Sequence, residues 1–248
     1  MLVQLQPTPG VRKKEGVDGM RTSHGSVWQR WALLAAILLW AAMTAGAHSQ
    51  SPATHDMLDA AMRGDAGRLA KLIAGGAPLD PTDNAQQTPL LLAVQANHLA
   101  AAEVLIKAGG NINAQAANKD TPWLLAGALG RTEMLRLMIP RGPNLSIRNR
   151  FGGNALIPAC ERAHVDTVKL LLTTNIDVNH INNLGWTCLL EIVILGDGGL
   201  RHVEVAQLVL AAGADPNIAD KDGVSPLAHA KRKGQRAIAQ LIANAGGR

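Results

Sequence analysis

Short apolar blocks alternate with polar, glycine-containing stretches from about residue 53 to the end of the chain. In one such unit, Thr88 and Pro89 precede the apolar run 90–93. This pair is typical of a helix start, because the hydroxyl caps the first turn and proline fits the first helical position. A second apolar run, 104–106, is followed by Gly109-Gly110, where glycine can supply the left-handed cap. The pattern predicts two short helices and a turn in each unit.

Two markers of this unit recur at the same step along the chain. The helix-start triplets begin at Thr88, Thr121, Asn154, Thr187 and Ser225, and the turns begin at Gly76, Gly109, Gly142, Asn175 and Gly213. Both series step by 33, 33, 33 and 38 residues, so the period is 33 with one five-residue insertion. Helices this short are unstable alone and must be buried against neighbouring units. We count six units, with the first and last as caps.

The 33-residue period and the Thr-Pro-Leu turn resemble the ankyrin repeat. The resemblance covers about residues 53–248 and implies an all-α solenoid of about six helix-turn-helix units with β-turn tips. His98, His164 and His202 stand where the family has the histidine of a Gly-His pair before the second helix, so we expect them to have a structural role. The family's histidine after Thr-Pro-Leu is replaced, for example by Leu91 and Leu124.

Two prolines interrupt the expected helices. Pro158 falls inside the first helix of the fourth unit, and Pro140 falls near the end of the preceding second helix. A proline in a helix interior costs about 3 kcal/mol. We therefore predict that units three and four are the least regular part of the stack.

The N-terminal region predicts export from the cytoplasm. Basic residues precede an apolar centre at 32–43, and Ala45-Gly46-Ala47 follows; these are the parts of a secretory signal peptide. We assign 1–47 to an extension and signal peptide, 48–54 to a linker and 55–248 to the repeat domain. An uncleaved inner-membrane anchor is the alternative, and translation could begin at Met1 or Met20. A cleaved signal peptide and an uncleaved anchor would both place the repeats in a bacterial periplasm.

Composition and charge narrow the function classes. Hydrophobic residues make up 47% of the chain and aromatic residues only 2%, which suits thin layers of alanine and leucine. The formal charge is +5 for the whole chain but +2 without residues 1–47, so there is no general case for nucleic acid. We interpret the basic run 231–233 as a solvated capping face and expect no nucleic-acid partner.

The cysteines and histidines indicate no enzyme. Cys160 and His164 are four residues apart, yet both occupy positions that the repeat uses for packing, so we assign no catalytic residue. Cys160, Cys188 and the histidines lack metal-site spacing, and we expect no metal and no cofactor. A Cys160–Cys188 disulfide requires Cα atoms within about 7 Å. A five-residue offset on helices about 8–10 Å apart exceeds that limit, so we expect two free, largely buried thiols.

The resemblance implies that partners bind the concave face, which turn tips and first helices form. The candidate partner-binding residues are Arg148, Arg150, Phe151, Arg162, Ile181, Leu184, Trp186 and Lys221. Further candidates are Glu161, Ile194 and Leu195 at the ends of first helices, and Asp222, Arg232 and Lys233 in the last unit. Aromatic and arginine side chains dominate binding hot spots, although packing between turns would also explain Phe151 and Trp186. The insertion at 194–200 is either part of this surface or a neutral lengthening of a loop.

The sequence therefore predicts a protein–protein interaction module in the periplasm, acting as a scaffold, accessory or inhibitor protein. We expect a monomer that meets a membrane only through its N-terminal segment, if that segment stays uncleaved. A metal- or small-molecule-binding repeat protein that uses the histidines and cysteines is the alternative. The partner's identity is not encoded in any of these patterns, because repeat proteins vary their surfaces on one scaffold.

Overall fold

The computed structural model describes residues 52–248. The signal peptide or anchor predicted at 1–47 lies outside these residues. The first described helix begins at Pro52, so the helical domain starts inside the segment that we assigned to a 48–54 linker. No helix in 52–248 combines the length and the apolarity that crossing a bilayer requires.

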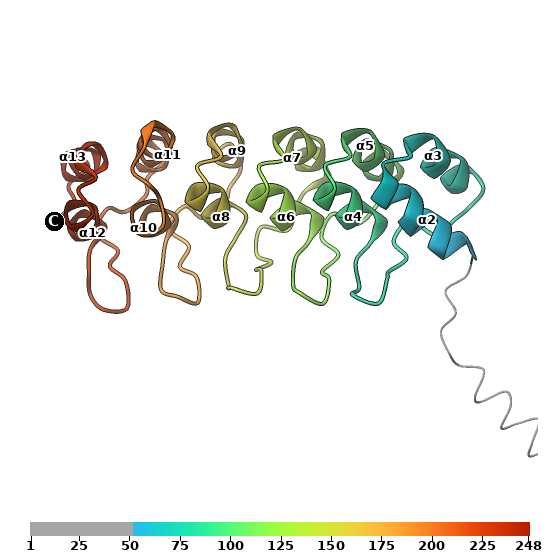
Figure 1. Cartoon of the computed structure of the whole chain (residues 1–248), viewed down its shortest axis with the longest axis horizontal. Helices are drawn as coiled ribbons and strands as arrows, with labels where there is room; N and C mark the ends of the chain where they lie inside the picture. The colour runs from blue at the N-terminus through green and yellow to red at the C-terminus, as the bar shows by residue number, and fades with distance from the viewer. Residues whose placement is uncertain (1–51) are drawn as a thin grey trace, which may run out of the picture. The chain divides into compact units, whose positions relative to one another are not determined.

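Within residues 52–248, six pairs of helices follow one another in a row, as the repeat predicts (Figure 1). The pairs are α2 (Pro52–Arg63) with α3 (Ala66–Ala74), α4 (Pro89–Gln95) with α5 (Leu99–Ala108), α6 (Pro122–Ala128) with α7 (Thr132–Met138), α8 (Leu156–Glu161) with α9 (Val165–Leu171), α10 (Cys188–Ile194) with α11 (Leu200–Ala211), and α12 (Pro226–Arg232) with α13 (Arg236–Asn244). The fold is all-α over the described residues.

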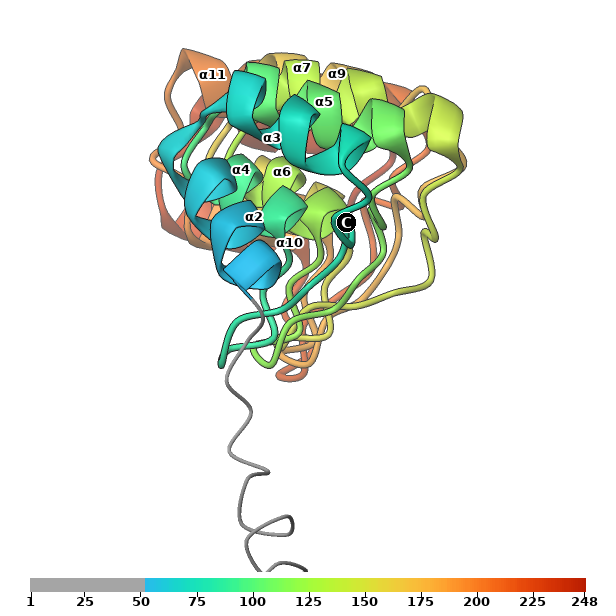
Figure 2. The same cartoon turned by 90° about the vertical axis from the view of Figure 1, so that its right-hand side faces the viewer.

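The first helices of the pairs form one layer and the second helices form another (Figure 2). The loops that join consecutive pairs extend from the layer of first helices, away from the second helices. The core lies between the layers and runs through every pair, and its largest buried side chain is Trp123. We call the side formed by the first helices and these loops the first-helix face; it corresponds to the concave face of the family resemblance.

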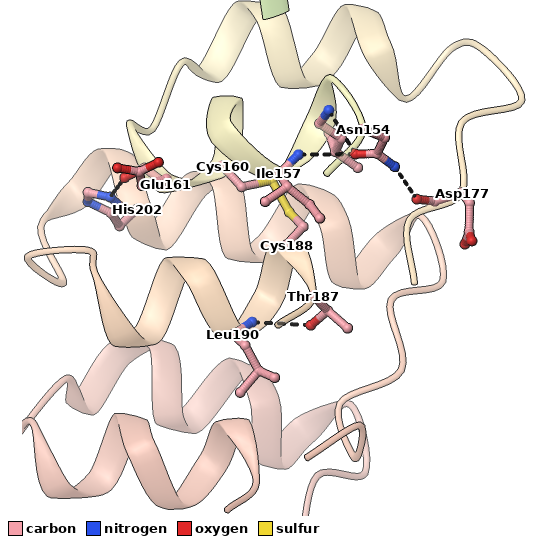
Figure 3. Close-up of a disulfide and its surroundings, with 10 residues drawn as sticks. Asn154, Ile157, Cys160, Glu161, Asp177, Thr187, Cys188, Leu190 and His202 are labelled. Atoms are coloured by element: carbon pink, nitrogen blue, oxygen red, sulfur yellow. Dashed lines mark hydrogen bonds between the residues drawn. A yellow bond between two sulfur atoms is a disulfide. The ribbon is translucent and has the colours of Figure 1, made fainter. Parts of the chain in front are cut away.

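The predicted helix starts are confirmed by their side-chain caps. The hydroxyls of Thr88, Thr121 and Thr187 accept hydrogen bonds from the backbone N–H three residues later, at 3.1–3.3 Å. In the fourth pair, Asn154 Oδ1 accepts from the N–H groups of Leu156 and Ile157 (Figure 3). Each cap satisfies donors that the first helical turn leaves without an intrahelical partner.

Polar residues of the turns also connect each unit to the next. The N–H of Asn111 donates to Asp80 Oδ1, and the N–H of Asn144 donates to Asn113 Oδ1, both at 2.9 Å. The same bond recurs between Asp215 and Asn179 at 2.7 Å. The recurring Asn or Asp of the turn marker is therefore a bridge between units.

The predicted irregularity of units three and four is confirmed. Their second helices have seven residues each, against nine to twelve in the other units, and α8 has only six. A 3₁₀ turn, Ile139–Arg141, contains Pro140 and follows α7. Pro158 is the third residue of α8, where an N–H has no intrahelical acceptor. The expected cost of an interior proline was therefore too high for Pro158.

The recurrent histidines have the structural role that we predicted. His98 Nε2 bonds to the Met62 carbonyl at 3.1 Å, and His202 Nε2 bonds to the Glu161 carbonyl at 3.0 Å. Both carbonyls belong to the first helix of a preceding unit. The His98 ring sits above Gly64, where a Cβ would lie 2.6 Å from the ring. Glycine is required at that site because any side chain would displace the bridging imidazole.

The prediction of two free thiols was wrong, because Cys160 and Cys188 form a disulfide (Figure 3). Their Cα atoms are 5.7 Å apart, within bonding range. The bond joins the last turn of α8 to the first residue of α10. Both cysteines are buried.

The error came from the assumed packing of first helices. We treated the sequence offset as a displacement along parallel neighbours and measured between helix axes, although facing Cα atoms lie closer than the axes do. The sixth residue after one helix-start marker actually lies against the first residue after the next marker. The preceding units show the same contact: a Cβ on Gly127 would lie 2.8 Å from the Ala155 Cβ. The disulfide occupies a contact that the repeat itself provides.

We predict that the disulfide stabilises the domain. It closes a loop with a sequence separation of 28, so its loss should lower the free energy of unfolding by about 3 kcal/mol. Urea denaturation of the oxidised chain, the reduced chain and a Cys160→Ala/Cys188→Ala variant measures this. The reduced chain keeps both sulfur atoms, so it separates the cross-link from packing. Equal unfolding midpoints for the oxidised and reduced chains would contradict the prediction.

Candidate protein-binding surface

The structure places the eight predicted residues on neighbouring loops and at one helix end of the first-helix face. Arg148, Arg150 and Phe151 lie in the loop before α8; Ile181, Leu184 and Trp186 lie in the loop before α10; Lys221 lies in the loop before α12; and Arg162 is the C-cap residue of α8. A hydrogen bond joins the loops before α8 and α10: the N–H of Asn183 donates to the Phe151 carbonyl at 2.9 Å. The repeat therefore brings these side chains into one region.

The exposed apolar side chains are the main feature of this region. Phe151 is 52% exposed, and Ile181 and Leu184 are each 49% exposed. Phe151 and Leu184 occupy the same position of consecutive repeats, one period apart. They form a short apolar strip at the loop tips, where about half of each side chain faces solvent.

Arg150 borders this strip. Its guanidinium carbon lies 4.6 Å from the centre of the Phe151 ring, which is within cation–π range. Its Nη1 is 3.8 Å from Asp120 Oδ2. Burial raises the pKa of Asp120, and the positive charge of Arg150 works against that rise.

Arg148 and Trp186 are less exposed than the strip. Arg148 Nη1 donates to the carbonyls of Leu145 and Ile147, at 2.5 and 3.2 Å. Trp186 is partly buried against the hydrophobic core. Both side chains hold their loops, so Phe151, Ile181 and Leu184 are the better candidates for direct contact.

Lys221 and Arg162 are exposed and are anchored to the preceding units. Lys221 Nζ donates to the Asn183 carbonyl, and Arg162 Nη1 donates to the Ala128 carbonyl, both at 2.5 Å. Leu195, which follows α10, is 51% exposed. Lys233 Nζ donates to the carbonyls on either side of Leu195, those of Ile194 and Gly196, at 2.7 and 3.0 Å.

Sequence reasoning missed a buried glutamate under the loop that carries Leu184. Glu191 is 5% exposed, and its Oε2 has no hydrogen-bond partner. Its Oε1 accepts from Asn182 Nδ2 at 2.8 Å. Asn182 Oδ1 in turn accepts from the N–H groups of Leu184 and Trp186, at 2.9 and 3.0 Å. Glu191 therefore orients the amide that shapes the loop.

The environment of Glu191 strongly raises the pKa of its carboxyl group. Burial, followed by repulsion from Glu161, raises the pKa of Glu191 to about 7, although the Asn182 hydrogen bond opposes the shift. The equivalent positions of other units hold Leu92, Leu125 and Pro158. An acidic residue at a position that is apolar in units two to four was the available signal for this site, although units one and six have Asp59 and His229 there.

The metal- or small-molecule-binding alternative loses two of its ligands, because the disulfide consumes both cysteines. Within 52–248, no three His, Cys, Asp or Glu side chains are grouped closely enough to hold a metal ion. A hollow of about 580 Å³ lies between α2 and α4, lined in part by His55, Met62 and Gln95. It is remote in sequence from the predicted binding residues.

Stacked short helix pairs with exposed loop tips define a helical repeat protein. The family model for ankyrin repeats (three copies) matches residues 57–149 and 123–220. This chain belongs to the ankyrin-repeat family. The chain is 39% identical over 192 residues to the ankyrin repeat protein YahD of Escherichia coli K12, covering 77% of this chain and 96% of YahD.

Solved structures agree with this assignment. An ankyrin repeat domain (ABAYE2397) from Acinetobacter baumannii AYE superimposes with a TM-score of 0.75 at 43% identity, covering 77% of this chain and 98% of that one. The ankyrin repeat domain of Bcl-3, a member of the IkappaB protein family, gives a TM-score of 0.69 at 26% identity, covering 78% of this chain and 86% of that one. Ankyrin repeats are general protein–protein interaction modules and typically lack enzymatic activity.

We predict that Glu191 makes stability pH-dependent near neutrality. The folded chain holds this proton more tightly than the unfolded chain, with a pKa of about 7 against 4.5. The resulting stabilisation is fully present below pH 4.5 and is lost as the pH rises through about 7. Between pH 4.5 and 8, wild type should therefore lose about 1–3 kcal/mol relative to a Glu191→Gln variant.

Chemical denaturation of both proteins across this pH range measures the difference. Glu133→Gln, which changes an exposed glutamate on α7, is the control and should run parallel to wild type. A constant difference between wild type and Glu191→Gln at every pH would contradict the raised pKa.

Proposed function

We propose that this chain is an exported, non-enzymatic protein-binding module whose partner binds the first-helix face of units three to six. The observation that carries the proposal is the strip of Phe151 and Leu184, which are about half exposed at equivalent loop tips. Only 2% of the chain is aromatic, and its one phenylalanine lies on this surface. Large apolar side chains at such positions are typical of interaction sites.

The framework under these side chains supports the proposal. The Asn182 amide fixes the loop that carries Leu184, and a hydrogen bond at the Phe151 carbonyl ties the two loops together. A surface ordered before binding loses less conformational entropy on association than a flexible one. Ankyrin-family membership supports a protein as the partner.

Capture from a periplasmic extract tests the proposed face. We expect wild type to retain a partner that a Phe151→Ser/Leu184→Ser variant loses, because the variant removes the apolar strip while leaving the core intact. A matched control, Met62→Ser/Leu99→Ser, changes two exposed apolar side chains of units one and two, outside the proposed face. This control should capture as well as wild type.

Mass spectrometry of the eluates and circular dichroism of each variant complete the experiment. Equal capture by wild type and the Phe151→Ser/Leu184→Ser variant would remove this face from the proposal. Loss of capture by both variants would place the partner on a larger surface than the one we propose.

Two observations support export. Residues 1–47 have the sequence pattern of a signal peptide, and a disulfide links Cys160 to Cys188. Disulfides persist in the periplasm and are rare in the reducing cytoplasm. Periplasmic location is therefore part of the proposal, with the segment either cleaved or retained as an anchor.

Thiol trapping in bacterial cells tests export. After acid quenching and denaturation, the full chain should resist a maleimide label, because its cysteines are already joined. A chain without residues 1–47 should take up the label on both cysteines. Labelling of the full chain together with its recovery from the cytoplasm would refute export, and the Cys160→Ala/Cys188→Ala variant sets the background.

A further inference from the structure

A buried carboxyl group connects the loop that carries Leu184 to the first helix beneath it. Glu191 lies in the first turn of α10 and is 5% exposed. Its Oε1 accepts from Asn182 Nδ2, and Asn182 Oδ1 accepts from the N–H groups of Leu184 and Trp186. Two consecutive hydrogen-bonded steps therefore join the Glu191 carboxyl group to the backbone of Leu184.

The same connection reaches Phe151. The N–H of Asn183, the residue after Asn182, donates to the Phe151 carbonyl, and Lys221 Nζ donates to the Asn183 carbonyl. The loops on either side are thus bonded to the segment that Asn182 holds. A displacement of this segment from α10 would disturb the contact that aligns Leu184 with Phe151.

The bond between helix and loop is separate from the turn itself. Asn149 occupies the position of Asn182 one unit earlier, and its Oδ1 also accepts from the N–H groups two and four residues further on. Pro158 takes the place of Glu191 in that unit, and its side chain has no hydrogen-bonding group. The turn therefore forms without a bond to the helix, and the bond from Glu191 fixes where the loop lies.

Unit six has the same connection with a different ionisable pair. Asp220 takes the place of Asn182, and His229 takes the place of Glu191. His229 Nε2 lies 2.7 Å from Asp220 Oδ2, and Asp220 Oδ1 accepts from the N–H groups two and four residues further on. The N–H of Val224, followed by the His229 hydrogen bond, lowers the pKa of Asp220. An ionisable helix residue thus holds the loop in each of the last two units.

The position of Glu191 favours an uncharged carboxyl group. Oε1 accepts from Asn182, while the buried Oε2 has no hydrogen-bond partner among the described residues. A carboxylate removed from water with so few hydrogen bonds has a large desolvation cost. That cost, followed by repulsion from Glu161, raises the pKa of Glu191 to about 7. Loss of the proton therefore favours states in which water reaches the carboxylate.

Among the described residues, no charged group next to α10 acts as a counter-ion for Glu191. Helices α8, α11 and α12 pack against α10, and Glu161 of α8 repels the charge. His202 of α11 bonds to the Glu161 carbonyl (Figure 3) and to Asp197, and His229 of α12 bonds to the loop of its own unit. The remaining ionisable side chains of these helices and their ends bond to other groups or are exposed; they are Arg162, Arg201, Glu204, Lys231, Arg232 and Lys233.

We propose that pH regulates partner binding at this face: protonated Glu191 holds the loop of Leu184 against α10, and loss of that proton releases the loop and weakens binding to the apolar strip. This inference rests on the proposed function and adds its regulation. Glu191 and Asn182 are positioning residues, because they act through the loop and need no contact with the partner.

Amide hydrogen exchange, followed by NMR on protein purified after expression of the full chain, tests the loop without a partner. With a pKa of about 7 when the loop is held and 4.5 when the carboxyl group is in water, release should become about tenfold more favourable between pH 6 and pH 8. The protection factors of the Leu184 and Trp186 N–H groups should therefore fall about tenfold. The Gly153 N–H, which bonds to Asn149, is the internal control and should keep its protection.

Two variants assign the effect to Glu191. Glu191→Gln keeps an acceptor for Asn182 and cannot ionise, so its protection factors should be equal at pH 6 and pH 8. Glu191→Leu introduces the residue that the repeat has at positions 92 and 125, and its protection should be low at both pH values. Both variants retain His229, so any effect of that side chain is common to all three proteins. Equal protection in wild type at both pH values, or an equal fall in wild type and Glu191→Gln, overturns the proposal.

Capture from the periplasmic extract at pH 6 and pH 8 then tests regulation of binding. Titration of the partner affects wild type and Glu191→Gln alike, so the readout is the ratio of partner captured by the two proteins. This ratio should fall at least threefold from pH 6 to pH 8. A constant ratio despite falling protection overturns the regulation. Capture that is independent of Phe151 and Leu184 at both pH values refutes the proposed binding face instead, and the protection factors still decide whether Glu191 holds the loop.

Discussion

Contact between consecutive units is the constraint on which the rest of this structure depends. The first helices of units two to six have only six or seven residues and are too short to be stable in water by themselves. Each pair therefore exists because its neighbours cover it. Every interface must fix both the spacing and the rotation of adjacent pairs.

Polar groups fix each interface at two places, which are the turns and the opposite ends of the first helices. At the turns, an Asn or Asp side chain accepts from the next unit's backbone, as Asn113 does from Asn144. At the opposite end of the first helices, an imidazole reaches back to a carbonyl, as His98 does to Met62. Unit three shows what happens when the ring is absent. Arg131 takes the place of the histidine, and its Nε is buried with no hydrogen-bond partner.

The parts of the fold that the sequence predicted are the local and repeated ones. Helix starts such as Thr121-Pro122 depend on neighbouring residues alone, and the 33-residue step multiplies the signal. The disulfide was missed because the approach of Cys160 to Cys188 depends on how two first helices pack, which no local pattern specifies. Glu191 was missed for a related reason: Asn182 and Glu161, which perturb its pKa, come from other segments. The loop-tip residues could be found because each residue's position in the repeat also predicts whether its side chain is exposed.

The position of the disulfide connects stability to binding. In a solenoid each interface contributes nearly independently, so among the internal units we expect local opening to cost least in the one with the shortest helices. That unit contains α8, with six residues and Pro158 among them. Cys160 lies in the last turn of this helix, two residues before Arg162, and Cys188 begins the next first helix two residues after Trp186. The covalent bond therefore crosses the interface that sets the distance between Phe151 and Leu184, and it keeps the apolar strip ordered where the helices alone hold it least.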